Sequence, residues 1–484
     1  MKTFRELRDE RLAAEQGTLF AQAELPIALV YPSPYHVGMS SLGFQTIYRE
    51  LNALPGVAAE RAFLPDDVAD ARARHESLCT YESNRPVADF SIVAFSLSYE
   101  LELAGLVSCL DLAGIPALAS ERDVPGRRWP LVVVGGPLTF SNPVPAGPMA
   151  DVIVMGEAEE AVATLVQAFR DSPDKRALLE TLAKMPGFFV PVIHGERPPA
   201  VLAVNNARLP AYSQIVTPHT ELSDMFLIEA ARGCSRTCTY CVMRRSTNGG
   251  MRKVEPDQIL PKIPDHARRV GLVGAAVTDH PRLPAILRSL IDSGRSIGVS
   301  SLRADRLDDE LVGLLAAGGY RTLTTASDGA SQRMRDEIKR GTSEENLRNA
   351  ARLCRAHNMA ALKLYMILGL PGETMDDIDD LIRFAKELSA IAPRLIITAA
   401  SFVAKRNTPL DRSPFEDIAV LEARLARLRT GLRGHVKLSG DSPKWAWVEY
   451  RLAQGGFAEG RAALTAARAG GGFAAWKAAL RAQG

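Results

Sequence analysis

Residues 231–241 read ARGCSRTCTYC and follow the apolar run MFLI at residues 225–228. The three cysteines of this loop, Cys234, Cys238 and Cys241, are separated by three and then by two residues. This spacing lets a short loop place three sulfurs around one face of an iron–sulfur cube, because soft thiolates suit iron–sulfur clusters. No fourth cysteine stands nearby. A 4Fe-4S cluster held here would therefore keep one iron open to a chelating cofactor or substrate.

Two other interpretations of these cysteines fit less well. Structural zinc takes four ligands, but Cys354 lies more than a hundred residues downstream and His219 precedes the loop. Three buried core thiols would need an apolar segment, whereas glycine, serine, arginine and threonine make this one a polar loop. The spacing therefore favours the cluster.

The Cys-x3-Cys-x2-Cys spacing, with the aromatic Tyr240 just before the last cysteine, resembles the cluster loop of the radical S-adenosylmethionine (radical SAM) superfamily. The resemblance implies that the three cysteines are the metal ligands and the catalytic centre. It implies that S-adenosylmethionine chelates the open iron and is cleaved, by one electron, to methionine and a 5′-deoxyadenosyl radical. An external reductant of the flavodoxin or ferredoxin type would supply that electron.

Length and composition limit the class of protein. A chain of 484 residues is too long for one ordinary core, so we expect two large domains and an appendage. A hydrophobic content of 46% and a charged content of 24% are typical of a soluble globular protein. The formal net charge of +2 gives no electrostatic sign of nucleic-acid binding, so we expect no nucleic-acid partner.

The chain also carries no visible targeting signal. The first eleven residues are heavily charged and lack the apolar core of a signal peptide. No apolar run approaches the roughly 20 residues that span a bilayer. The remaining cysteines, Cys79, Cys109 and Cys354, are isolated, which argues against a disulfide framework. We therefore expect a cytoplasmic protein with no membrane association.

The N-terminal half alternates short apolar strands with helices. We predict strands at residues 26–31, 90–97, 116–118, 130–137 and 151–157, and helices at 37–51, 101–112 and 159–169. This order indicates an α/β fold with a doubly wound, Rossmann-like domain over residues 25–186, behind a helical arm at residues 1–24.

The predicted strand ends of this domain resemble the cobalamin-binding domain that precedes the cluster domain in one branch of radical SAM enzymes. The resemblance implies cobalamin contacts from glycines, serines and one glutamate of these loops, namely Ser40, Ser96, Gly135, Gly136, Gly156 and Glu157. The Asp-x-His-x-x-Gly motif that ligates cobalt is absent, and we interpret His36 as an exposed turn residue. A domain that kept this fold without cobalamin is the alternative.

The second half again alternates strands and helices. After a linker at residues 187–220, we predict strands at 225–228, 272–277, 296–300, 321–325, 361–368 and 394–398. Six parallel strands predict a partial (β/α)6 TIM-type barrel, the radical SAM core, over residues 221–412. Residues 413–484 are predicted to form a helical cap, packed on the barrel through Trp445, Trp447 and Trp476.

The ends of these strands carry the candidate contacts to S-adenosylmethionine. The hexapeptide GLPGET at residues 369–374 resembles the turn that superfamily members place near the adenine. Superfamily members usually place a Gly-Gly-Glu segment against the amino group of the cofactor's methionine part. That segment is missing here, and Asp279 would supply the acidic group instead. The full predicted set is Tyr240, Asp279, Ser301, Arg303, Thr325, Asp328, Gly369 and Glu373.

These observations predict a cobalamin-dependent radical SAM enzyme that transfers a methyl group to an unactivated carbon. One alternative is a cobalamin-free radical rearrangement or cyclisation, and another is a non-catalytic sensor of cobalamin or redox state. A methylthiotransferase acting on RNA or protein is disfavoured, because that class carries three further N-terminal cysteines. Only Cys79 and Cys109 occur there.

Overall fold

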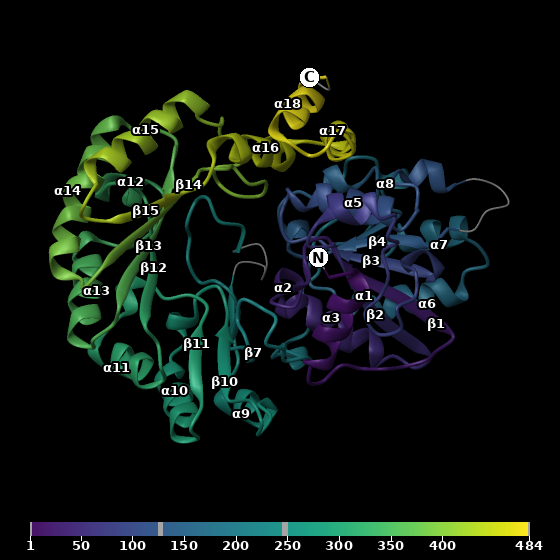
Figure 1. Cartoon of the computed structure of the whole chain (residues 1–484), viewed down its shortest axis with the longest axis horizontal. Coiled ribbons are helices and arrows are strands. Elements are labelled where there is room, and N and C mark those ends of the chain that lie inside the picture. Colours follow the sequence, from purple (N-terminus) through teal and green to yellow (C-terminus); the bar gives the residue numbers. More distant parts are fainter. Residues whose placement is uncertain (1, 124–128, 244–249, 483–484) are drawn as a thin grey trace. The chain divides into compact units, whose positions relative to one another are not determined.

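The computed structural model describes residues 2–123, 129–243 and 250–482. The chain divides into two compact units, one made of Met1–Met225 with Arg451–Gly484 and the other of Phe226–Tyr450 (Figure 1). Each unit combines parallel strands with helices, so the predicted α/β class is confirmed. Among the described residues, no helix is both long enough and apolar enough to cross a bilayer.

The first unit is built on one six-stranded sheet in the order β2-β1-β3-β4-β5-β6. Its strands are β1 (Leu25–Tyr31), β2 (Val57–Phe63), β3 (Ile92–Ser96), β4 (Leu131–Gly135), β5 (Val152–Val154) and β6 (Phe188–Phe189). The first five strands pair in parallel and β6 pairs antiparallel to β5. Parallel strands end at the same edge, so the loops after β1, β3, β4 and β5 share that edge.

Helices of the first unit cover this sheet. They are α1 (Phe4–Ala13), α2 (Tyr35–Gly38), α3 (Leu42–Asn52), α4 (Val68–Ala73), α5 (Glu102–Leu112), α6 (Ala161–Asp171), α7 (Lys175–Leu182), α8 (Pro191–His194), α17 (Phe457–Arg468) and α18 (Phe473–Arg481). Tyr31 of β1, Phe44 of α3 and Leu165 of α6 are buried in the same apolar core. The later helix α17 packs on α5, and α18 packs on α17.

The sheet differs from the prediction at three places. Residues 116–118 form no strand, and the predicted linker contributes β6 to the sheet edge. The second strand in the chain, β2, was missed because Glu60 and Arg61 interrupt its apolar residues. All seven residues of β2 are nevertheless buried, which requires partners for the two charges.

Those partners form a buried ion network. The Arg61 guanidinium is fully buried, with Nη2 2.7 Å from Glu15 Oε2 and Nε 2.7 Å from Glu82 Oε1. Tyr35 donates a further hydrogen bond to Glu15 at 2.7 Å. Glu15 lies just after α1, so this network fixes the N-terminal arm to the sheet.

The second unit contains two main groups of strands. They run in the orders β11-β10-β7 and β12-β13-β14-β15. The pairs β10–β11, β12–β13, β13–β14 and β14–β15 are parallel. The strands are β7 (Met225–Glu229), β10 (Arg269–Val273), β11 (Ser296–Val299), β12 (Thr322–Asp328), β13 (Ala361–Leu368), β14 (Leu395–Ser401) and β15 (Lys437–Gly440). A parallel bridge between Leu302 and Thr325 joins the segment after β11 to β12. A separate antiparallel pair, β8 (Ala231–Gly233) with β9 (Met251–Lys253), flanks the cysteine loop.

Helices alternate with these strands. They are α9 (Pro256–Ile259), α10 (Leu283–Asp292), α11 (Asp309–Ala317), α12 (Gln332–Glu337), α13 (Glu344–Ala356), α14 (Met375–Ile391), α15 (Ile418–Gly431) and α16 (Pro443–Gln454). Contacts join α13 to β12 and β13, and α14 to β14. The buried residues of these strands, such as Leu323, Leu364 and Ile397, alternate with more accessible ones, so one face of the sheet is fully covered and the other only partly.

The expected C-terminal cap is divided between the units. The strand β15, which was not predicted, extends the sheet beside β14 in the second unit, whereas α17 and α18 belong to the first. Trp476 is buried in α18, which belongs to the first unit and not to a cap of the second, and Trp445 is 38% exposed. The alanine-rich buried face of α17 fits closely on α5, but its periodicity alone could not tell which surface it would cover.

Candidate active site

The cysteine loop begins where β8 ends. Gly233 adopts a φ of +79°, a conformation that glycine takes without steric cost, and the chain turns there into the loop. Cys238 is buried, Cys234 and Cys241 are half-buried, and all three are free thiols. The buried strand β7 precedes the turn, so the loop starts from a rigid element.

Two backbone hydrogen bonds hold the middle of the loop. The amide of Thr239 donates to the carbonyl of Ile338 at 3.1 Å, and the amide of Leu410 donates to the carbonyl of Thr239 at the same distance. The loop is therefore fixed between the turn after α12 and the segment after β14.

The donor set of the loop fits a 4Fe-4S cluster. Burial raises the pKa of Cys241, and the charges of Cys238 and Cys234 raise it further, against a backbone hydrogen bond at Met243 that lowers it. Among the described residues, no three His, Cys, Asp or Glu side chains are grouped around one point as ligands of a single ion. A cube offers a separate iron to each thiolate, and thiolates are its usual ligands.

Tyr240 and Arg340 meet on one carboxylate at the end of β12. Tyr240 donates from its hydroxyl to Asp328 Oδ2 at 2.5 Å, and Arg340 Nε lies 2.7 Å from the same oxygen. Burial and the charge of Asp328 raise the pKa of Tyr240 well above its ordinary value. Burial alone would lower the pKa of Arg340, but the charges of Asp328, Tyr240 and Cys238 outweigh burial and raise it. The predicted residues Tyr240 and Asp328 are therefore brought together, with a cation on the same carboxylate.

Asp279 is engaged by arginines of its own unit. Arg236, which lies inside the cysteine loop, donates to both carboxylate oxygens at 3.0 and 2.9 Å. Arg306 donates to Oδ1 at 3.0 Å, and Ser235 donates to Oδ2 at 3.2 Å. Burial alone would raise the pKa of Asp279, but the arginines outweigh it and lower the pKa to about 2. In this structure Asp279 ties the loop to the segment after β10.

Three further predicted residues lie on the neighbouring strand ends. Ser301 donates to the carbonyl of Gly274 at 2.9 Å, and Thr325 donates to the carbonyl of Leu302 at 2.8 Å. Arg303 is 4% exposed, and within the described residues its Nε has no hydrogen-bond partner. Ser301 and Thr325 thus shape the backbone, whereas Arg303 pairs with Asp305 at 2.9 Å and keeps one unused donor, its Nε.

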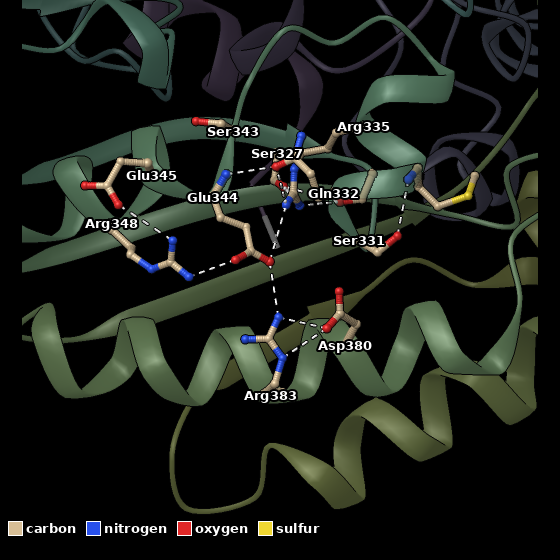
Figure 2. Close-up of polar contacts among 12 residues, drawn as sticks. Ser327, Ser331, Gln332, Arg335, Ser343, Glu344, Glu345, Arg348, Asp380 and Arg383 are labelled. Carbon is tan, nitrogen blue, oxygen red and sulfur yellow. Dashed lines mark hydrogen bonds and ion pairs between the residues drawn. The ribbon is translucent and has the colours of Figure 1, made fainter.

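A polar network braces the end of β12, as Figure 2 shows. Arg335 is buried and donates to the Ser327 hydroxyl at 3.2 Å. The guanidinium also lies 3.9 Å from Glu344 of α13. Glu344 in turn pairs with Arg348 at 2.8 Å and with Arg383 of α14 at 3.2 Å. The strand end that carries Asp328 is therefore linked to α12, α13 and α14.

The turn after β13 encloses a buried glutamate. The amide of Gly369, whose φ is +82°, donates to Glu373 Oε1 at 2.8 Å, and Arg424 Nη1 lies 3.1 Å from the same oxygen. Within the described part of the chain, Glu373 Oε2 has no hydrogen-bond partner. Burial raises the pKa of Glu373 to about 7. Gly369 and Glu373 thus stabilise the turn itself.

In the first unit, the predicted cobalamin residues contact their own chain. Gly136 has a φ of +101°, and a Cβ there would lie 2.6 Å from the carbonyl oxygen of Leu97. Gly156 has a φ of +89°, and its Cβ would lie 2.4 Å from the carbonyl oxygen of Leu202. We expected these glycines to admit a ligand, but backbone packing already requires them. Glu157 likewise accepts a hydrogen bond from the amide of Val204 at 2.8 Å.

The other three cobalamin predictions lie at or near the same edge. Ser96 and Gly135 are the last residues of β3 and β4 and face each other in register. Ser40 follows α2 and donates to the carbonyl of His36 at 2.7 Å. His36 is exposed, as predicted.

Sequence reasoning missed the cations of this site. Arg236, Arg306, Arg340 and Arg424 each contact a predicted residue. Only Arg236 carried a local signal, because it stands between two cysteines of the loop. The other three come from distant segments, so only the fold brings them to the site.

Comparison with known proteins gives the class. A family model described as "Radical SAM proteins, N-terminal" matches residues 43–191, and one described as "Radical SAM superfamily" matches residues 228–385. The second match includes the whole cysteine loop. The fold and this loop define an α/β protein of the radical SAM type. The chain belongs to the radical SAM superfamily and is an enzyme, as the resemblance implied.

Three curated relatives illustrate its neighbours. An uncharacterized protein of Methanocaldococcus jannaschii is 25% identical over 399 residues, which are 81% of this chain and 80% of that protein. The tRNA-2-methylthio-N(6)-dimethylallyladenosine synthase of Halalkalibacterium halodurans is 27% identical, over 40% of this chain and 39% of its own. The ribosomal protein uS12 methylthiotransferase of Clostridioides difficile is 27% identical, over 44% of this chain and 49% of its own length. The chain thus spans less than half the length of these two methylthiotransferases.

A similar solved structure is the cobalamin-dependent S-adenosylmethionine radical enzyme OxsB with aqua-cobalamin bound. Its TM-score is 0.54 at 16% sequence identity, and the match covers 76% of this chain but 53% of OxsB. The chain therefore spans about half the length of OxsB. At this identity the similarity concerns the fold alone.

Proposed function

We propose that this enzyme holds a 4Fe-4S cluster through Cys234, Cys238 and Cys241, cleaves S-adenosylmethionine reductively, and transfers a methyl group to an unactivated carbon with the help of cobalamin. The observation that carries the proposal is the three-thiol loop, anchored at the strand ends and surrounded by charged side chains. An external one-electron reductant of the flavodoxin or ferredoxin type is part of the proposal.

When bound, the cluster would supply the electron that cleaves S-adenosylmethionine to methionine and a 5′-deoxyadenosyl radical, and cobalamin would carry the methyl group. The chain's own residues orient and shield the reactants. Arg340 adds a positive charge to the carboxylate that Tyr240 of the loop contacts. Arg303 is paired with Asp305, and its remaining Nε donor could reach an anionic group such as the cofactor carboxylate. Tyr240 is held against Asp328, which keeps its ring in one place.

The first unit supports the cobalamin part of the proposal. Its parallel strands follow the order β2-β1-β3-β4-β5, which is the flavodoxin-type order of doubly wound domains. Such sheets bind ligands at the carboxyl ends of their strands. OxsB, which shares the fold, is named a cobalamin-dependent enzyme.

One observation favours a second candidate, a cobalamin-free radical rearrangement or cyclisation. Gly136 and Gly156, the glycines that suggested a ligand cradle, are explained by contacts with Leu97 and Leu202. Methylthio transfer is less well supported despite the names of two relatives. Cys109 is fully buried in α5, and it cannot serve a second cluster without unfolding that helix.

The test is a metal and product analysis of protein made anaerobically with cobalamin supplied. We expect about four irons and one cobalt per chain, and 5′-deoxyadenosine after reduction with S-adenosylmethionine present. A triple Cys234/Cys238/Cys241→Ala variant should lose the iron and the product but keep the cobalt. Iron without cobalt would select the cobalamin-free candidate, and a parent protein without iron would overturn both.

A further inference from the structure

One face of the β12–β14 sheet in the second unit is polar and open. On the covered face, Leu323, Leu362 and Leu364 are at most 2% exposed. On the opposite face, Tyr365 is 43% exposed and Lys363 is partly exposed. Barrel interiors are normally filled by bulky apolar side chains, so exposed polar groups on this face need another explanation.

The strand register places these polar groups in two rows. In parallel strands, paired residues point to the same side of the sheet. The first row runs Thr324, Lys363, Ile396, Lys437, and the second runs Ala326, Tyr365, Thr398, Ser439. Neighbouring strands are about 4.8 Å apart, so the Cα atoms of Lys363 and Lys437 are about 10 Å apart across β14.

Short contacts connect the members of these rows. Lys363 Nζ donates to the Tyr365 hydroxyl at 3.0 Å and lies 4.7 Å from the centroid of its ring. The hydroxyls of Thr398 and Ser439 are 3.0 Å apart. Each contact leaves lone pairs or N–H groups available, because an ammonium has three donors and a hydroxyl both donates and accepts.

The two lysines of this face have no anionic partner. Within the described ranges, no carboxylate lies within ion-pair distance of Lys363 or Lys437. The arginines of the same unit behave differently, since Arg236 and Arg340 are both paired with aspartates. An open surface with two unneutralised ammonium groups and several hydroxyls has the chemistry of an anion site.

This face leads toward the cysteine loop. Ile367 lies two residues after Tyr365, on the same side of β13, which is about 7 Å further along the strand. Ile367 and Tyr240 of the loop pack against the same apolar cluster. A substrate whose anion is bound at Lys363 would have to extend about 13 Å along β13 to reach Ile367, which packs on the same cluster as Tyr240.

We propose that Thr324, Lys363, Tyr365, Thr398, Lys437 and Ser439, here called the lysine–hydroxyl face, bind an anionic group of the substrate, a phosphate or a carboxylate. The inference rests on the proposed function in one respect, because it takes the anion to belong to the substrate of the radical reaction. It adds that this substrate is an anion.

Pyridoxal 5′-phosphate tests the proposal, because it combines a phosphate with an aldehyde that reports on lysines. The aldehyde condenses with a lysine amine, releasing water, and sodium borohydride reduces the imine to a stable amine. Peptide mass mapping of the full chain then shows which lysines reacted. Lys386, exposed on α14, is the internal reference. We expect about tenfold more adduct on Lys363 than on Lys386, the ratio that one charge-assisted hydrogen bond supports.

Competition identifies the anion. Inorganic phosphate should protect Lys363 but not Lys386 if the substrate group is a phosphate, and acetate should do so if it is a carboxylate. Lys437→Gln should weaken this protection, whereas Lys386→Gln should leave it unchanged. Equal labelling of Lys363 and Lys386, or labelling of Lys363 that neither anion reduces, would overturn the proposal.

The experiment separates this inference from the proposed function. Labelling depends on the sheet face and needs neither iron nor S-adenosylmethionine. Protection of Lys363 in a protein that binds no iron would keep the anion site and overturn the radical chemistry. If the protein holds its full iron and forms 5′-deoxyadenosine, but neither anion protects Lys363, the radical chemistry stands and the anion site is overturned.

Discussion

The two units bury their charges in different places. In the first unit, Arg61 lies inside strand β2, between Glu15 and Glu82, and holds the N-terminal arm. In the second unit, the charges gather at strand ends, where Asp279 and Asp328 connect arginines to the cysteine loop. The difference indicates that buried charge maintains the fold in one unit and positions reactive groups in the other.

The largest effect is expected from removing one of the cysteine ligands of the cluster. Cys238→Ala should abolish cluster binding and 5′-deoxyadenosine formation, because the cube loses one of three thiolate ligands. Iron analysis and product chromatography measure both. Cys354→Ala, which changes a buried core thiol of α13, should keep the iron. Equal iron in the Cys238 variant and the parent would contradict the assignment of the loop.

The next effect concerns the core of the first unit. Arg61→Met should lower the free energy of unfolding by about 3–5 kcal/mol, because Glu15 and Glu82 would be buried without a cation. Urea denaturation followed by circular dichroism measures this change. Iron content should not change.

A matched control is available in the same unit. Arg176→Met removes an exposed pair with Glu180 and should hardly change the denaturation midpoint. If Arg61→Met instead lost iron while keeping its stability, the division of roles between the two units would be wrong.

The buried glutamate of the second unit gives a pH dependence. The folded pKa of Glu373 is raised to about 7 by burial, above its ordinary value, so the folded state binds the proton more tightly than the unfolded state. Stability should therefore fall as the pH rises from about 4.5 to about 7, by roughly 1–3 kcal/mol. Glu373→Gln should lose this dependence. If the free energy of unfolding changed equally with pH in the parent and in the Glu373→Gln variant, the raised pKa of Glu373 would be contradicted.

The smallest effect tests whether strand-end charge acts on the cluster. Arg340→Met removes the cation paired with Asp328, the carboxylate that Tyr240 of the cysteine loop contacts. The reduction potential should therefore become more negative, by about 60 mV for a tenfold change in the one-electron equilibrium. Redox titration monitored by electron paramagnetic resonance measures it. Arg333→Met, on the exposed side of α12, is the control and should not shift the potential. An unchanged potential in the Arg340 variant would limit that residue to a structural role.

Several elements were predictable because their signals are local. The strand at residues 361–368 was predicted with the bounds of β13, and continuous apolar residues marked β1 and β4. Charged residues hid β2, because Glu60 and Arg61 looked like surface residues until their partners were known. The destination of α17 was hidden as well, since an apolar helix face does not specify what it covers.

The candidate site follows the same division. The spacing of Cys234, Cys238 and Cys241 lies within one loop, so the sequence alone determined the donor set and, through it, the class of enzyme. Tertiary structure decided which charges surround the loop, because Tyr240 and Asp328 are 88 residues apart and Arg340 lies further still along the chain. Electrostatic partners meet only when separate strands end at one edge, whereas a ligand spacing is complete before the chain folds.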